Sequence, residues 1–326
     1  MNRNKATPPP PTETETGASD DEPVLPTVPD VWWGSEEFDG AQVLGLKATV
    51  ATFSKKGEHK LHANEDRYAA FTDLGAELAA KLNGSSYDGA PAGSTPPSHC
   101  FFGVYDGHGG SSAAQHLASR LHLLLAADPA LWRESPRQAM INAFALAESE
   151  LRQTYERDRE DHSGSCACVG LLRGRRLTVA HTGDCRMVLL RGETCHEPVV
   201  QMTRDHRATE PSEQKRILRS GGKISDGRVW GALMPSRTLG DFPWKDKGPG
   251  LSAEPEICEY EITPDDKYLV LGSDGLFDVH TNKSIGKVVC KMTSSAQKVN
   301  NELQKELRKK PTGDDCTMIV VALQCV

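Results

Sequence analysis

Residues 101–110, FFGVYDGHGG, begin as an apolar run and end with an aspartate, a histidine and three glycines. Short apolar runs rich in aromatic and β-branched residues favour strands, so we expect a buried strand over Cys100–Tyr105. Asp106 and His108 then follow the strand, and the glycines allow a close approach of the main chain to a ligand. The segment lacks the ligand spacing of an EF-hand, and it is neither a Walker loop nor a complete GxGxxG. A calcium-binding loop and a nucleotide-binding loop are therefore disfavoured.

The sequence on either side of this stretch predicts further strands and long helices. Ala113 to Leu125 and Met140 to Tyr155 carry apolar residues along one helical face, and Ser135-Pro136 is a typical start for the second helix. A later helix carries Ala296, Val299, Leu303 and Leu307. The other predicted strands are 47–54, 166–172, 177–181, 187–190, 268–271 and 317–323.

Strand pairs that follow one another without a helix between them indicate antiparallel sheets, with the helices on their outer faces. We therefore predict one α+β layered domain over residues 42–326. Residues 1–41 are rich in Pro, Thr, Glu and Asp and are expected to form a solvated tail. Residues 84–98 look like a surface insertion.

Composition narrows the class of protein. The formal charge of -7 argues against nucleic acid as a partner and suits a protein that gathers cations. Nine scattered cysteines without a CxxC pair suggest neither a zinc ribbon nor a disulfide framework. No run is apolar enough to predict a membrane span or a signal peptide, and Asn2 stands where the usual myristoylation signal has glycine. We expect a monomeric protein in the cytoplasm or nucleus.

Several carboxylates share one context, because each lies just beyond an apolar run, often beside a glycine. Strands that end at one rim of a sheet would gather these side chains, and their mutual repulsion would then require divalent cations. Mg²⁺ and Mn²⁺ prefer carboxylate, carbonyl and water oxygens. A turn aspartate that caps a strand is the alternative for any one of them. The residues are Glu65, Asp66, Asp106, Asp184, Asp274, Asp278, Asp314 and Asp315.

The chain resembles the metal-dependent protein serine/threonine phosphatases of the PP2C (PPM) type over about residues 45–326. The resemblance implies a four-layer fold, in which a central sandwich of two antiparallel β-sheets is flanked by helices, with a two-metal site at one end. It rests on motifs that occur in this order: NEDRYAAF, FFGVYDGHGG, SGSCACVGLL, LTVAHTGDCRMVLLRGE, QMTRDHRA, RVWGALMPSRTLGDFPWK, AEPEI, YLVLGSDGLFDV and DDCTMIVV.

The resemblance also implies roles for individual residues. Asp66, Asp106, Asp274, Asp314 and the Gly107 carbonyl are the expected ligands of two Mg²⁺ or Mn²⁺ ions. Asp106 bridges the ions, and Glu65 holds metal-bound water. Asp184 and Asp278, together with Asp274, match a weaker third metal site.

The implied reaction is hydrolysis of phosphoserine and phosphothreonine in protein substrates. A hydroxide that bridges two ions about 4 Å apart attacks the phosphorus directly. His108 protonates the departing oxygen as a general acid. Residues 203–244 form a flap beside the site, in which Arg237 and Asp241 of SRTLGD are signature residues that stabilise the region.

The sequence departs from the family pattern at three places. Cys166 stands in SGSCA, where many relatives have SGSTA. The last metal motif reads Asp314-Asp315 rather than Asp-Asn, which leaves open which carboxylate faces the metal. Leu61 stands where many members place a phosphate-binding arginine, and the neighbouring Lys60 is the candidate replacement, as a point charge without arginine's fork.

Two alternatives to an active protein phosphatase stay open at this point. One is a catalytically weak or inactive member that kept the fold as a regulatory or scaffold protein. Retention of Asp66, Asp106, Asp274 and Asp314 argues against it. The other is a small-molecule phosphatase or sensor that uses the same metal site.

Overall fold

The protein is described from a computed structural model, in the ranges 37–38, 42–43, 46–58, 60–81, 99–126, 134–192, 199–290, 295–310 and 312–325. The predicted insertion 84–98 lies outside these ranges, as does the predicted tail except for Glu37–Phe38. Those two residues form β1, which pairs with Val50 and Ala51.

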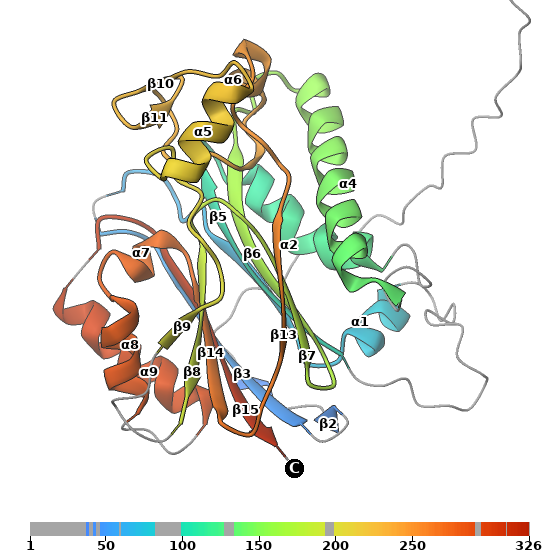
Figure 1. The fold of residues 1–326 in the computed structure, drawn as a ribbon, viewed down its shortest axis with the longest axis vertical. Coiled ribbons are helices and arrows are strands. Elements are labelled where there is room, and N and C mark those ends of the chain that lie inside the picture. The colour runs from blue at the N-terminus through green and yellow to red at the C-terminus, as the bar shows by residue number, and fades with distance from the viewer. Residues whose placement is uncertain are drawn as a thin grey trace, which may run out of the picture.

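Two antiparallel sheets form the centre of the molecule, as predicted (Figure 1). The first sheet has the order β1-β3-β15-β14-β8-β9, with β2 paired to β3. The second has the order β13-β7-β6-β5-β4, with β12 paired to β6. The strands of the first sheet are β2 (Gln42–Val43), β3 (Leu46–Lys55), β8 (Arg186–Arg191), β9 (Val199–Gln201), β14 (Asp266–Gly272) and β15 (Cys316–Cys325). Those of the second are β4 (Arg67–Phe71), β5 (His99–His108), β6 (Gly164–Arg173), β7 (Arg176–Thr182), β12 (Leu239–Gly240) and β13 (Glu256–Glu261).

Side chains that point alternately to the two faces of each strand form the apolar layers of the fold. In β5, Cys100, Phe102 and Val104 pack between the two sheets, whereas Phe101 and Tyr105 face the helices outside. Because successive side chains of a strand point to opposite faces, a strand that is apolar throughout must be covered on both sides. The FFGVY run is such a strand, and it determines that helices cover this sheet.

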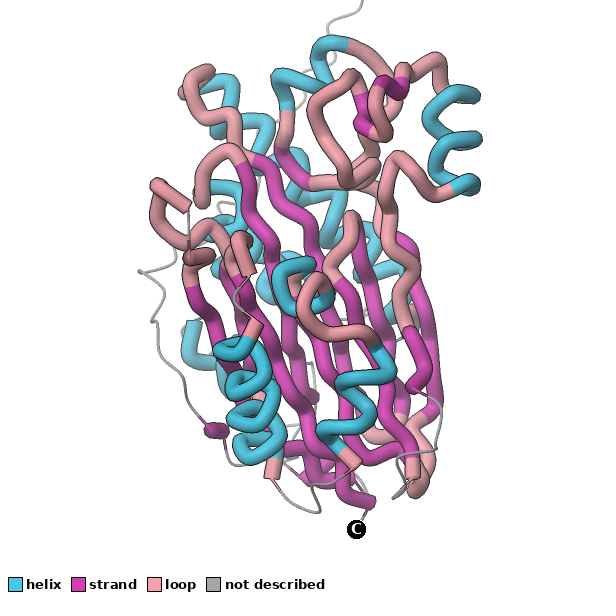
Figure 2. The backbone as a smooth tube through the Cα atoms, turned by 90° about the vertical axis from the view of Figure 1, so that its left-hand side faces the viewer, coloured by secondary structure: helices cyan, strands magenta, loops and turns pink. Residues whose placement is uncertain are grey.

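The helices lie on the two outer faces of the sandwich (Figure 2). α2 (Ser112–Leu125) and α4 (Pro136–Arg157) pack on the outer face of the sheet that contains β5. α8 (Asn282–Val289) and α9 (Ala296–Lys309) pack on the outer face of the other sheet through Ile285, Val299 and Leu303. Within the described residues, no helix is both long and apolar enough to cross a membrane.

The segment 203–244, here called the flap, gathers at one end of the sandwich (Figure 1). It contains α5 (Pro211–Arg219), β10 (Ile224–Ser225) and β11 (Arg228–Val229), around a small core of Ala208, Ile217 and Val229. α5 begins with Pro211 at its first position, where proline's missing amide hydrogen removes no hydrogen bond from the helix. The strands β4 and β13, and the helices α1 (Leu74–Lys81), α6 (Phe242–Lys247), α7 (Asp274–Phe277) and α8, were absent from the sequence-based assignment.

Candidate metal centre

The carboxylates singled out in the sequence come from separate strand ends and meet at one end of the sandwich. Asp106 lies near the end of β5, Asp184 in the turn between β7 and β8, and Asp274 at the start of α7. One carboxylate oxygen from each of these three lies within 4.8 Å of the others. The predicted convergence of Asp106, Asp184 and Asp274 is therefore confirmed.

Asp66 joins this cluster from the segment that precedes β4. The Ser273 hydroxyl donates to Asp66 Oδ2 at 2.8 Å, which ties it to the start of α7. Its other oxygen, Oδ1, is buried and has no hydrogen-bond partner. A buried carboxylate oxygen without a partner is costly, and a hard divalent cation is the partner that suits it. The donor set thus fits Mg²⁺ or Mn²⁺.

Burial and mutual repulsion shape the electrostatics of the cluster. Burial, together with the neighbouring carboxylates, raises the pKa of Asp66 to about 7 and that of Asp274 to about 8. The pKa of Asp106 is also raised, by burial first and then by Asp66 and Asp274. Without cations, the folded protein therefore holds these aspartates partly protonated near neutral pH.

Glu65 and Gly107 lie where the chain segments approach most closely. Glu65 Oε1 accepts a hydrogen bond from the Gly110 amide at 2.8 Å, and its Oε2 lies 3.3 Å from His62 Nδ1. A Cβ atom at position 107 would lie 2.4 Å from the Glu65 carbonyl oxygen. Only glycine allows β5 to pass this close to the segment that carries Glu65 and Asp66.

The neighbours Asp314 and Asp315 have different environments. Asp315 is buried, with Oδ1 accepting from the Gly57 amide and Oδ2 from the Glu65 amide, each at 2.8 Å. The Asp314 side chain is 42% exposed, and it contributes to the raised pKa values of Asp106 and Asp274. Both oxygens of Asp315 thus accept main-chain hydrogen bonds, whereas the contacts of Asp314 with the Asp315 amide and with Lys60 both fall on its Oδ1.

Lys60 points at this pair of aspartates. Its Nζ lies 2.5 Å from Asp314 Oδ1 and 3.3 Å from Asp315 Oδ2. Burial alone would lower the pKa of Lys60, but the hydrogen bond and charge of Asp314 outweigh it and raise the pKa above its ordinary value. The next residue, Leu61, is fully exposed. Lys60 is therefore a permanent cation at the rim of the cluster.

His108 is fixed by a residue far away in the sequence. Its Nε2 lies 2.8 Å from Asp241 Oδ2, and Asp241 is buried with a left-handed φ of 57°. A Cβ atom at Gly164 would lie 2.3 Å from that carboxylate, so the glycine makes room for it. Burial alone would lower the pKa of His108, but the charge and hydrogen bond of Asp241 outweigh it and raise the pKa. Sequence reasoning placed Asp241 in the flap but missed this contact.

A second group of potential ligands, His181, His206 and Glu256, does not form a comparable site. The two imidazoles are stacked 4.4 Å apart with 6° between their planes. Ring-nitrogen lone pairs lie in the ring plane, so stacked rings do not direct them at one point. His181 Nε2 already lies 2.8 Å from the Arg204 carbonyl oxygen. His181 is a buried residue of β7.

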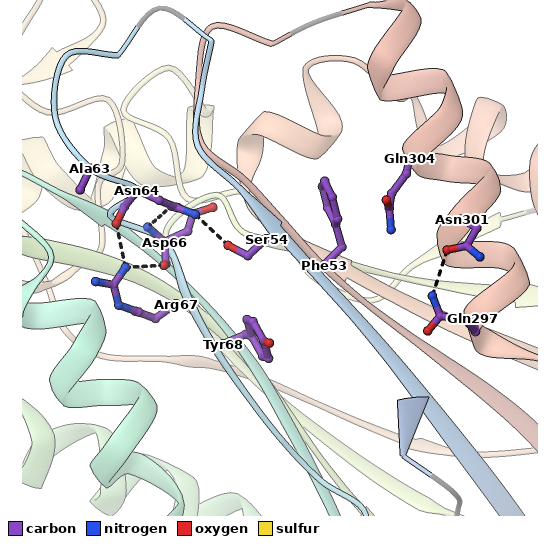
Figure 3. A pocket seen from close by; sticks show the side chains of 10 residues that line it. All are labelled: Phe53, Ser54, Ala63, Asn64, Asp66, Arg67, Tyr68, Gln297, Asn301 and Gln304. Atoms are coloured by element: carbon purple, nitrogen blue, oxygen red, sulfur yellow. Dashed lines mark hydrogen bonds between the residues drawn. The ribbon is translucent and has the colours of Figure 1, made fainter. Parts of the chain in front are cut away.

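A groove of about 720 Å³ runs beside the cluster, between α9 and the β3–β4 region (Figure 3). Asp66 and Arg67 border one side of it, and Gln297, Asn301 and Gln304 of α9 border the other (Figure 3). Arg67 is fixed by hydrogen bonds from Nη1 to the Asn64 and Asp66 carbonyl oxygens at 2.8 Å. The groove thus shares Asp66 with the acidic cluster and has a mixed polar and apolar lining.

The pKa shifts predict how the stability of the metal-free protein depends on pH. The folded-state pKa values of Asp66 and Asp274 lie above the unfolded value of about 3.9, so the folded protein holds more protons between these limits. Stability is lost as pH rises through the folded pKa values. In EDTA, we expect the melting temperature to fall between about pH 6.5 and 8.5 and Mn²⁺ to restore more of it at the higher pH.

Buried histidines have the opposite effect on the pH dependence of stability, but they act below the window of about pH 6.5 to 8.5. Burial and the charge of His181 lower the pKa of His206 to about 3, and burial lowers that of His181. These groups destabilise the fold only below the unfolded value of about 6.5. Asp106→Asn is the control, because it removes one repelling charge and should flatten the slope. A melting temperature that is constant or rises over the window would contradict the prediction.

Comparison with known proteins places this centre in a family. The family model described as "Protein phosphatase 2C" matches residues 75–316. The chain is 33% identical over 273 residues to "Probable protein phosphatase 2C 2" of Oryza sativa subsp. japonica, covering 79% of this chain and 67% of the relative. It is 33% identical over 265 residues to "Probable protein phosphatase 2C 27" of Arabidopsis thaliana, covering 79% and 64%. The chain thus spans about two thirds of the length of these relatives.

Solved structures show the same fold. The "serine-threonine phosphatase 2C from Toxoplasma gondii" is similar, with a TM-score of 0.67 at 21% identity over 92% of this chain and all of that one. A "C.elegans sex determining protein" is similar as well, with a TM-score of 0.68 at 21% identity over 89% of this chain and 65% of that one. The chain belongs to the protein phosphatase 2C family, whose members are metal-dependent protein serine/threonine phosphatases.

Proposed function

We propose that the protein hydrolyses phosphoserine and phosphothreonine in protein substrates with two Mg²⁺ or Mn²⁺ ions at the acidic cluster. The observation that carries this proposal is the unpartnered, buried Oδ1 of Asp66, beside the group of Asp106, Asp184 and Asp274. Four carboxylates in one place repel one another unless cations are present. An inactive member that served only as a scaffold would have no use for such a cluster.

The residues that would hold the ions are Asp66, Asp106, Asp274 and Asp314, with the Gly107 carbonyl as a further ligand. When bound, the ions supply an acidified water as nucleophile and neutralise charge on the phosphoryl oxygens. Asp106 would be the ligand shared by both ions, as the family resemblance implies, and the charges of Asp66, Asp274 and Asp314 contribute to its raised pKa. Glu65, held by the Gly110 amide, is placed to accept a hydrogen bond from water at the centre.

His108 supplies the proton for the leaving oxygen. Asp241 holds its imidazole in one orientation at 2.8 Å and stabilises the protonated form. A serine or threonine alkoxide is a poor leaving group, so its protonation in the transition state lowers the barrier. The monomeric state and the location in cytoplasm or nucleus stay predictions.

The first test is the dependence of activity on the metal. We expect hydrolysis of a phosphothreonine peptide with Mn²⁺, none with EDTA, and at least about a 100-fold lower kcat/KM for Asp106→Ala, because a ligand shared by both ions is lost. Asp265→Ala, which removes an exposed carboxylate in the turn between β13 and β14, is the matched control and should retain activity. Activity that survives EDTA or Asp106→Ala would refute the two-metal mechanism.

The second test compares leaving groups. We expect His108→Ala to lower kcat for the phosphothreonine peptide roughly 10²- to 10⁴-fold, and to affect p-nitrophenyl phosphate much less, since p-nitrophenolate leaves without a proton. Asp241→Asn, which keeps the shape but not the charge, should show the same selectivity with a smaller loss. Equal losses for both substrates would exclude the general-acid role of His108.

The third test concerns the substrate phosphate. We propose that Lys60 contributes a point charge to phosphate binding in place of the arginine that Leu61 replaces. At saturating Mn²⁺, we expect Lys60→Ala to raise KM a few-fold with kcat little changed, and Lys60→Arg to restore binding. Lys56→Ala, an exposed lysine on the same segment, is the control. If Lys60→Ala left kcat/KM unchanged, Lys60 would be excluded from this role.

A further inference from the structure

Arg207 enters the acidic cluster from the flap. Its Nε donates to Asp184 Oδ2 at 2.9 Å, and its side chain is 28% exposed. The main chain on both sides of Arg207 is anchored, because the Ala208 amide donates to the Met234 carbonyl and the Ser236 amide donates to the His206 carbonyl. Arg207 itself forms an antiparallel bridge with Pro235. The guanidinium is thus held at the cluster by a fixed piece of backbone.

The second oxygen of Asp184 is occupied as well. The Cys166 thiol donates to Asp184 Oδ1 at 3.4 Å, and the Asp184 side chain is only 4% exposed. Cys166 is the residue that departs from the SGSTA pattern. Both carboxylate oxygens of Asp184 therefore have partners from the chain, in contrast to Asp66, whose Oδ1 has none.

The positive charge of Arg207 also acts on carboxylates that lie near Asp184. It acts on Asp184 and Asp274, and it opposes the rise in pKa that burial gives to Asp278. Asp184, Asp274 and Asp278 are the three residues that the family resemblance assigned to a weaker third metal site. The guanidinium thus already neutralises charge at the place where a third ion would have to bind.

We propose that the Arg207 guanidinium takes the place of a third divalent ion beside Asp184, Asp274 and Asp278, so that the protein binds two divalent ions and not three. A third ion would need an Asp184 oxygen that Arg207 and Cys166 now hold, and it would meet the repulsion of a permanent guanidinium. The same contact fastens the flap to the metal centre. This inference rests on the proposed two-metal function and adds that no third divalent ion binds.

Equilibrium dialysis against Mn²⁺, with metal analysis of the dialysed protein, tests the inference without an activity readout. We expect two Mn²⁺ per chain for the wild type and a third, weaker Mn²⁺ for Arg207→Ala and for Arg207→Gln. Adding Asp184→Asn to Arg207→Ala should return the count to two, because the vacated ligand is lost. Circular dichroism on the same samples verifies that the variants are folded.

Arg204→Gln is the matched control, since Arg204 lies on the same segment but pairs with Glu256. It should bind two Mn²⁺ like the wild type. A wild type that binds three Mn²⁺, or folded Arg207 variants that stay at two, would overturn the inference alone. A wild type that binds none would overturn the proposed two-metal centre and this inference together.

Discussion

Repulsion among buried and half-buried carboxylates is the constraint on which the functional end of this protein depends. Asp66, Asp106, Asp184 and Asp274 come from four separate segments, and burial strengthens the repulsion between their charges. Among the described residues, Lys60 pairs with Asp314 and Arg207 pairs with Asp184 at the edges of the cluster. The middle, around Asp66 and Asp106, has no basic side chain within hydrogen-bond distance among the described residues. Divalent ions are the charges that would complete it.

The β-sandwich tolerates this repulsion because apolar packing away from the acidic cluster stabilises the fold. Three apolar layers, one between the sheets and one under each set of helices, run the length of the strands. The acidic side chains lie beyond these layers, where strands end and turns begin. Glycines bring the turns together, as at Gly275, where a Cβ atom would lie 2.0 Å from the Asp315 carbonyl oxygen. A rigid scaffold thus holds ligands that repel one another.

The strands and the main ligands could be predicted because their signals are local. The continuous apolar run at 101–105 and the aspartate that follows it indicate a buried strand near its end, and the order of motifs identifies the family. β4 was missed because its five residues, RYAAF, include an arginine and two alanines and contain no β-branched residue. β13, EICEYE, alternates acidic and apolar residues, a pattern typical of a strand with one solvated face, so its sequence does carry a signal that could have found it.

Contacts between distant segments could not be predicted. The bond between His108 and Asp241 joins residues 133 positions apart, and it needs a left-handed aspartate and a glycine opposite it on β6. The different environments of Asp314 and Asp315 arise from two amides contributed by the segment after β3. The engagement of Asp184 by Arg207 and Cys166 likewise depends on where the flap crosses the strand ends.

The most direct test of the account is anomalous diffraction from crystals of the Mn²⁺-loaded protein, measured at the manganese absorption edge. We expect two peaks about 4 Å apart, both within coordination distance of Asp106, and none on Asp184. Peaks that lie outside the cluster, or a single peak that does not contact Asp106, would contradict it.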